Sequence, residues 1–128
     1  MMKSYSKTLL RFSAAFGLMG AFMGAHMAGS GGYELRPIHA HILVVGWLSL
    51  FSFAIYYRVF HQKESFLAKL HVWTAIIGTV GLTLGMWFQF VNPFSFPDTV
   101  SLIIYIIGGS VLLISYILFF VLTLMNKE

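Results

Sequence analysis

The stretch TVSLIIYIIGGSVLLISYILFFVLTL, residues 99–124, contains no charged side chain. It is long enough to cross a bilayer as a helix, which takes about 20 consecutive apolar residues. Three earlier stretches are similarly apolar, and they cover residues 8–29, 37–60 and 66–91. Short segments rich in turn-forming residues separate the four: SGGYELR, HQKES and NPFSFPD. The pattern predicts an all-α membrane protein with four up-and-down transmembrane helices in one domain, residues 1–128.

The composition agrees with a membrane protein and excludes several other classes. Hydrophobic residues make up 59% of the 128 residues and charged residues 9%, whereas soluble domains carry about 25% charged residues. The chain has no cysteine, which excludes disulfides, thiolate metal sites and covalently attached c-type haem. Nothing supports nucleic-acid binding, because the basic residues are scattered at the ends of the apolar runs. The first run is long for a signal peptide and ends in glycines, so we expect a retained span.

The distribution of Lys and Arg predicts the orientation of these spans. Cytoplasmic loops of membrane proteins carry an excess of basic residues. One basic residue, Arg36, lies between the first two spans, and the others lie on the opposite side: Lys3, Lys7, Arg11, Arg58, Lys63, Lys69 and Lys127. We therefore expect both termini and the HQKES segment in the cytoplasm, with the protein in the cytoplasmic membrane of a bacterium.

Two histidines stand at the start of the second span, in the sequence RPIHAHILVVGWLSL, residues 36–50. Polar groups inside a membrane are costly and often mark a functional site. Side chains two positions apart on a helix point about 200° apart, so His39 and His41 suit two sites on opposite flanks rather than one metal ion. His26, near the end of the first span, lies at about the same depth. The ordinary alternative is that these are interfacial histidines bonded to a loop or to water.

Three segments in series resemble the last part of the catalytic subunit of haem–copper oxidases. HAHILVVG, from residue 39, resembles the H-x-H helix of that family. AKLHVWTAIIGTVGLTLGM, from residue 68, resembles the following helix, which begins A-K-I-H-F. FPDTVSLIIYIIGGSVLLIS, from residue 96, resembles the last helix, which opens Y-P-D and carries a G-S pair. The resemblance covers residues 37–124 and implies one four-helix arc of the haem–copper oxidase core.

The resemblance also implies a cofactor. In the family the first histidine of H-x-H binds the high-spin haem and the second binds the low-spin haem, so His39 and His41 become expected axial ligands. His26 is a third candidate imidazole, and Arg36 is the expected partner of a haem propionate, because a guanidinium pairs well with a carboxylate. Haem b is the expected type, although haem a or o would need no change of residue, and the absent cysteines exclude covalent attachment.

Several family motifs are missing, and their absence limits the expected function. The H-P-E helix, the adjacent His–His pair and the cross-linked tyrosine have no counterpart, so we expect neither copper nor oxygen reduction by the family's full mechanism. The H-D motif is replaced by GGYEL, and Gly46-Trp47 lies one residue closer to His41 than the family's glycine, which indicates an offset in this helix. We expect electron transfer, haem handling or gas binding, and any catalysis would be that of an oxidoreductase component.

Other residues have ordinary structural explanations. Gly20 with Gly24, and Gly81 with Gly85, form G-x-x-x-G motifs that allow helices to pack closely. Aromatic residues near span ends are typical of interfacial belts, and these are Tyr56, Tyr57, Trp73 and Trp87. We expect a structural role for His71, a solvated side chain at His61, and bonds from Gln89 and Asn92 to loop backbone rather than to a haem propionate.

Two alternative functions and one assembly follow. The chain could be a b561-like electron carrier, with His26 and His41 on one haem and His61 and His71 on another. It could also be a haem-free assembly or interaction protein. One arc cannot enclose a haem whose ligands diverge by about 200°, so we expect a homotrimer in which His39 of one protomer faces His41 of the next, with a dimer as the alternative. The expected partners are the bilayer, further copies of the chain and a redox partner of unknown identity.

Overall fold

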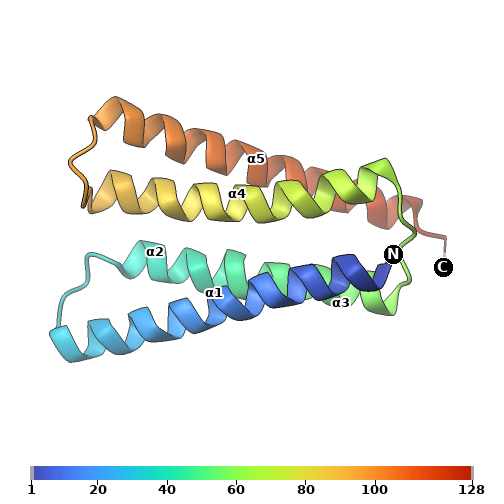
Figure 1. The fold of residues 1–128 in the computed structure, drawn as a ribbon, viewed down its shortest axis with the longest axis horizontal. Coiled ribbons are helices and arrows are strands. Elements are labelled where there is room, and N and C mark those ends of the chain that lie inside the picture. Colours follow the sequence, from blue (N-terminus) through green and yellow to red (C-terminus); the bar gives the residue numbers. More distant parts are fainter. Residues whose placement is uncertain (1, 128) are drawn as a thin grey trace.

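A computed structural model describes residues 2–127, with side chains from Tyr5 to Lys127. These residues are helical and contain no β-strand: α1 (Met2–Ser30), α2 (Arg36–His41), η1 (Ile42–Ser49), α3 (Leu50–Val59), α4 (Phe66–Phe90) and α5 (Asp98–Met125). Since α2, η1 and α3 follow one another without a break, they form one rod (Figure 1). All four resulting rods are long and apolar enough to cross a membrane. The prediction of four helices long and apolar enough to cross a membrane is confirmed, and the first helix begins at Met2, before the predicted residue 8.

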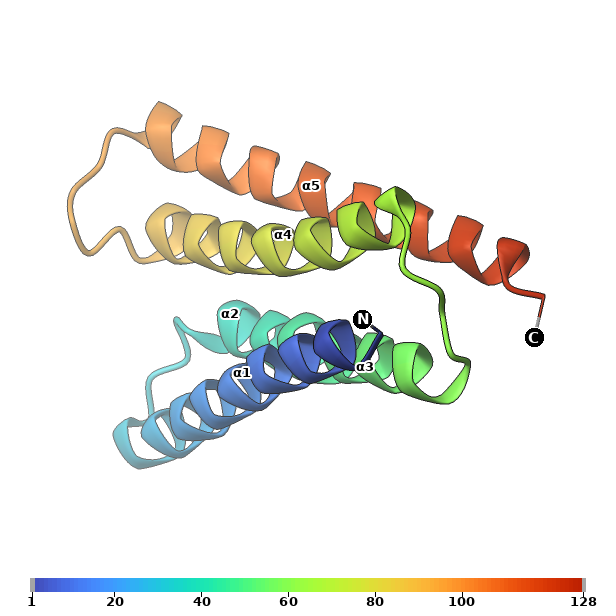
Figure 2. The same cartoon turned by 45° about the vertical axis from the view of Figure 1, so that its right-hand side comes forward.

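The rods form two antiparallel hairpins, one of α1 with α2–η1–α3 and one of α4 with α5 (Figures 1 and 2). Both chain ends and the segment 60–65 lie at one end of the molecule, which we call the terminal end. The segments 31–35 and 91–97 lie at the other end, together with the end of α1 and the start of α2. We call this the histidine end, because it carries His26, His39 and His41.

Glycines bring the helices of each hairpin close together. A Cβ on Gly78 would lie 2.5 Å from the backbone nitrogen of Leu112, and one on Gly85 would overlap the backbone of Tyr105. In the other hairpin, the Cβ position of Gly20 is taken by the side chain of Leu43. Small residues let helices approach when lipid supplies no hydrophobic force between them. The close packing predicted from the two G-x-x-x-G motifs is therefore confirmed, and both motifs are used within one chain.

The second rod contains a π-helical segment, η1. Within it, the Ser49 hydroxyl donates a hydrogen bond of 3.0 Å to the carbonyl of Val44, five residues earlier. Gly46 lies directly against Phe16 of α1, which occupies the place of a side chain. The backbone of a π-helix is bonded between residues five apart, and such segments are rare and frequently occur at functional sites. The pattern changes the register of the residues that follow Gly46.

Hydrogen bonds join the two hairpins in the terminal half of the molecule. The Tyr116 hydroxyl of α5 donates to the Ser49 hydroxyl at 2.7 Å, and Asn126 donates to the hydroxyl of Tyr56 at 3.1 Å. Tyr56 and Tyr57 are 8% and 0% exposed, so the expectation that they belong to an interfacial belt is wrong. Their rings pack in the core because the facing helices present other aromatic rings there.

Candidate functional site

His39 lies on α2 and faces the other helix of its own hairpin. Its ring rests on Gly24 of α1, where a Cβ would come within 3.0 Å of the imidazole Cε1. The side chain is half-buried, and its Nδ1 is buried without a hydrogen-bond partner. Gly24 thus makes room for an imidazole, and the packing leaves one ring nitrogen unsatisfied.

His41 has a different environment. Its Nδ1 lies 2.9 Å from the carbonyl oxygen of Pro37, one turn earlier. A carbonyl can only accept, so Nδ1 carries the proton and Nε2 carries the lone pair. Histidines that bind metals are held in this way, with the second ring nitrogen donating to a carbonyl or carboxylate. Of the candidate residues, His41 is thus the one whose ring is held in place by a hydrogen bond at Nδ1.

His39 and His41 belong to the same regular helix α2, so their side chains leave its axis about 200° apart. No group of three or more His, Cys, Asp or Glu in the described part of the chain could hold a metal ion.

His26 and Arg36 are both exposed at the histidine end. The Arg36 guanidinium lies 4.6 Å from the centre of the Tyr33 ring, a distance typical of a cation–π interaction. An exposed guanidinium in this position is free to pair with a carboxylate outside the chain. His26 extends from α1 two residues beyond Gly24, on which His39 rests.

His71 is completely buried at the junction of the two hairpins. Its Nδ1 lies 2.9 Å from the Tyr57 hydroxyl, and that hydroxyl donates to the Ala68 carbonyl at 3.2 Å. The Tyr57 proton therefore serves the carbonyl, and Nδ1–H of His71 donates to the tyrosine oxygen. The rings of Phe53 and Phe119 lie 4.7 and 5.4 Å away, and Nε2 is buried without a hydrogen-bond partner. This environment fits the expected structural role of His71. The hydrogen bond to Tyr57 joins residues on either side of the segment 60–65, and no sequence motif predicts it.

The remaining polar residues have separate positions. Asn92 bonds both backbone groups of Phe96, at 2.9 and 2.8 Å, as expected of a residue that supports a loop. The Gln89 side-chain oxygen is buried without a partner, so the bond expected from it to loop backbone is not formed by that oxygen. His61 is exposed in the segment 60–65, whereas His71 is enclosed by core rings. This arrangement does not favour the two-haem alternative, which needs both on one haem.

Comparisons of this chain with protein-family models, with curated proteins and with solved structures found no match. The relation to haem–copper oxidases therefore stays a prediction from the three sequence segments.

Proposed function

We propose that this chain is an integral membrane haem-binding protein that transfers electrons. The proposal is carried by one observation, the hydrogen bond of 2.9 Å between Nδ1 of His41 and the Pro37 carbonyl. It presents Nε2 as an oriented ligand at the membrane entrance of a helix. The H-x-H resemblance supplies the choice of haem b. Bound haem would provide a one-electron redox centre, and Arg36 would hold a propionate.

The two histidines do not fit the role equally well. His41 fits directly, since its second ring nitrogen is already satisfied. A bond from Nε2 of His39 would leave Nδ1–H buried without an acceptor, which costs about 1–3 kcal/mol. We therefore assign His41 as the principal ligand and His39 as the second ligand, with His26 as the imidazole able to replace it. The missing copper motifs are the reason for proposing electron transfer instead of oxygen reduction.

The proposed orientation places both termini and the segment 60–65 in the cytoplasm. All these parts lie at the terminal end. Six of the eight Lys and Arg residues have described side chains near that end: Lys7, Arg11, Arg58, Lys63, Lys69 and Lys127. An excess of basic residues on the cytoplasmic side is the general rule for membrane proteins.

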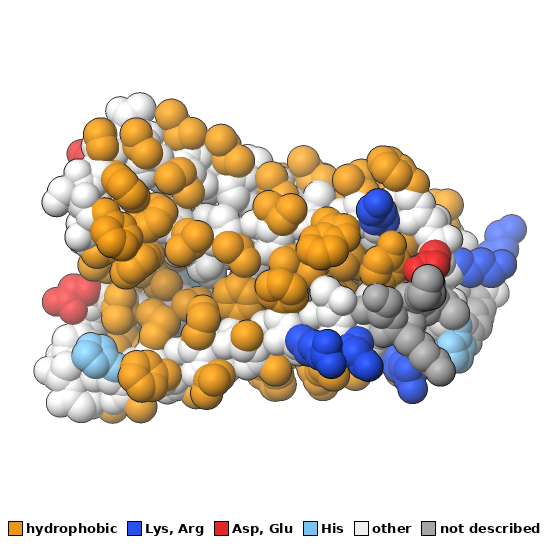
Figure 3. All heavy atoms as spheres, viewed as in Figure 1, with side chains coloured by type: hydrophobic (Ala, Val, Ile, Leu, Met, Phe, Trp, Pro, Cys, Tyr) orange, Lys and Arg blue, Asp and Glu red, His pale blue; other side chains and the backbone are white. Residues whose placement is uncertain are grey.

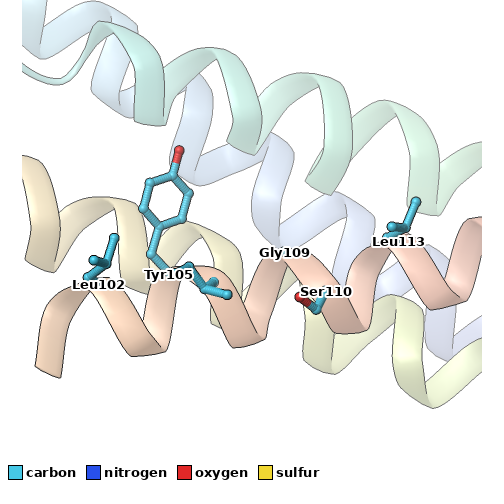
Figure 4. A pocket seen from close by; sticks show the side chains of 6 residues that line it. Leu102, Tyr105, Gly109, Ser110 and Leu113 are labelled. Carbon is cyan, nitrogen blue, oxygen red and sulfur yellow. The ribbon is translucent and has the colours of Figure 1, made fainter. Parts of the chain in front are cut away.

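The proposed assembly is a homotrimer with haem between protomers. Its main support is the divergence of His39 and His41 on one helix. Figure 4 shows a further feature of α5: Tyr105 and Leu113 extend to the same side of the helix, with Gly109 between them. A hollow of about 330 Å³ results there, and Ser110, which also lines it, is an exposed polar residue within a span. Small and hydroxyl residues are typical of contacts between transmembrane helices.

Haem content is the direct test of the proposed function. The protein would be purified in detergent from haem-supplemented cells, and its pyridine-haemochrome spectrum would be measured against its concentration. We expect haem b at about one per chain. Two haems per chain would favour the b561-like alternative, and absence of haem would favour a haem-free assembly protein.

A further inference from the structure

The backbone connects the two hairpins at one end of the molecule. The segment 60–65, which joins α3 to α4, lies at the terminal end (Figure 1). The segments 31–35 and 91–97, at the histidine end, each join two helices of the same hairpin. Within residues 2–127 the chain therefore passes from one hairpin to the other at the terminal end alone.

The hydrogen bonds between the hairpins lie in the same half. The Tyr57 hydroxyl is bonded to the Ala68 carbonyl and to the His71 ring of α4, and the Tyr116 hydroxyl of α5 donates to Ser49. No hydrogen bond between described side chains joins α1 or α2 to α4 or α5. In a bilayer no water replaces a broken bond, so breaking these bonds would leave polar groups without partners. This junction therefore resists separation.

The contacts of the histidine half are apolar and incomplete. There α2 and η1 contact α4, and Ile38 and Ile42 are buried. Two adjoining hollows of about 270 and 350 Å³, both lined by Met19, Thr83 and Leu84, lie between α1 and α4 from the middle of the molecule to this end. On the face seen in Figure 3, hydrophobic side chains of both hairpins meet in this half, whereas Lys and Arg side chains lie toward the terminal end.

This difference in chemistry determines where the hairpins can separate. The hydrocarbon of a bilayer is as apolar as the side chains of a helix, so apolar contacts between helices can be exchanged for lipid at little cost. The hollows lower that cost further, because atoms that line a void have no partners across it to lose. Separation is therefore much easier in the histidine half than at the hydrogen-bonded junction.

Each hairpin is closely packed within itself. In the second hairpin, Gly108 of α5 faces the backbone of Gly81 of α4. In the first, Gly46 of η1 lies directly against Phe16 of α1. Closely packed contacts of this kind transmit displacement with little deformation. Each pair of helices should therefore move as one body.

From these observations we infer that the two hairpins turn as rigid bodies about the junction at the terminal end. Their separation at the histidine end then varies, and the hollows between α1 and α4 widen and narrow with it. Hinge motions of whole helix pairs take microseconds to milliseconds. The inference is independent of haem.

Double electron–electron resonance between two spin labels tests this hinge in lipid nanodiscs. The chain has no cysteine, so a thiol-reactive label attaches at introduced cysteines alone. Phe22→Cys with Phe90→Cys reports the separation of α1 from α4 at the histidine end, and Arg58→Cys with Lys69→Cys reports that of α3 from α4 at the terminal end. All four positions are exposed. We expect a broad or two-peaked distance distribution for the first pair and a narrow one for the second.

Two pairs within hairpins separate hinge motion from mobility of the labels themselves. Phe22→Cys with Val44→Cys lies within the first hairpin, and Phe90→Cys with Leu102→Cys lies within the second, all at exposed positions. Both pairs should give narrow distributions. The labelled protein is mixed with excess unlabelled protein before reconstitution, so that distances within one chain are measured whatever the oligomeric state.

Either of two results would overturn the inference. One is a distribution for the Phe22/Phe90 pair as narrow as those within the hairpins. The other is a distribution for the Arg58/Lys69 pair, or for the pairs within hairpins, as broad as that of the Phe22/Phe90 pair, because the hairpins would then not turn as rigid bodies about the terminal end. Circular dichroism confirms that the labelled variants remain helical.

Discussion

At the scale of single residues, the hydrogen bonds of imidazole nitrogens distinguish the histidines from one another. In His41, Nδ1 is hydrogen-bonded to the Pro37 carbonyl. In His71, Nδ1 is hydrogen-bonded to Tyr57, and Nε2 is enclosed by core rings. His39 has a buried Nδ1 without a partner. These differences favour His41 over His39 as the proposed ligand and place His71 in the core, although all three belong to helices long enough to cross a membrane.

The bond between Tyr57 and His71 should stabilise the junction of the two hairpins. Tyr57→Phe keeps the ring but leaves the His71 Nδ1–H and the Ala68 carbonyl without the hydroxyl. We expect the free energy of unfolding to fall by about 1–2 kcal/mol, because buried donors and acceptors become unsatisfied. Reversible unfolding in mixed micelles measures the loss. Tyr33→Phe, at an exposed ring, is the matched control and should leave the free energy of unfolding unchanged. An unchanged free energy of unfolding in Tyr57→Phe would contradict the assigned hydrogen bond.

At the scale of elements, the contact between α4 and α5 depends on backbone meeting backbone. Gly108 faces the backbone of Gly81 and Leu82 so closely that a Cβ would overlap with them. No side-chain rotation can relieve such an overlap, so the helices themselves must separate.

Gly108→Ala should therefore destabilise the second hairpin strongly. Overpacking a tight contact costs about 1–3 kcal/mol or more, and the absence of any flexible neighbour favours the upper part of this range. Unfolding in mixed micelles and the yield of folded protein measure the effect. Gly29→Ala provides the control, since a Cβ there meets nothing within 4 Å. If both variants kept the stability of the unmodified protein, the packing described for α4 and α5 would be wrong.

The helices and the site differ in how far sequence predicts them. Length and hydropathy suffice for the four rods, because a span is a local property of the chain. The glycine motifs predict close packing for the same reason. The π-helical segment involves Gly46 against Phe16, thirty residues away, and the pair of Tyr57 with His71 forms only when α3 meets α4. The sequence positions of His39 and His41 predict that both lie at the start of the second span. They do not predict that His39 rests on Gly24 or that His41 bonds to Pro37.

At the scale of the whole molecule, hydrogen bonds join the two hairpins in the terminal half, and α2 also contacts α4 in the histidine half. The exposed side chains of the spans are mostly apolar and fit contact with lipid. An arrangement of protomers around a closed symmetry axis would cover part of this surface and would bring histidines of neighbouring chains together.

The proposed homotrimer predicts the mass of the complex. Native mass spectrometry of the haem-loaded protein in detergent should give three chains with haem retained, because both protomers contribute ligands to each haem. Ala substitution of His41 should remove the haem, and it should also weaken the trimer if haem bridges the chains. A monomer with its full haem complement would contradict the interfacial site, since both ligands would then come from one chain.

The visible absorption spectrum of the His41→Ala variant tests the central claim most directly, because that claim is an axial bond from one oriented imidazole. We expect the unmodified protein to be low-spin and to hold about one haem b per chain. The His41→Ala variant should lose haem or become high-spin. The same substitution at the exposed His61 should leave the spectrum unchanged. A His41→Ala protein that keeps the low-spin spectrum and full haem content would contradict the account.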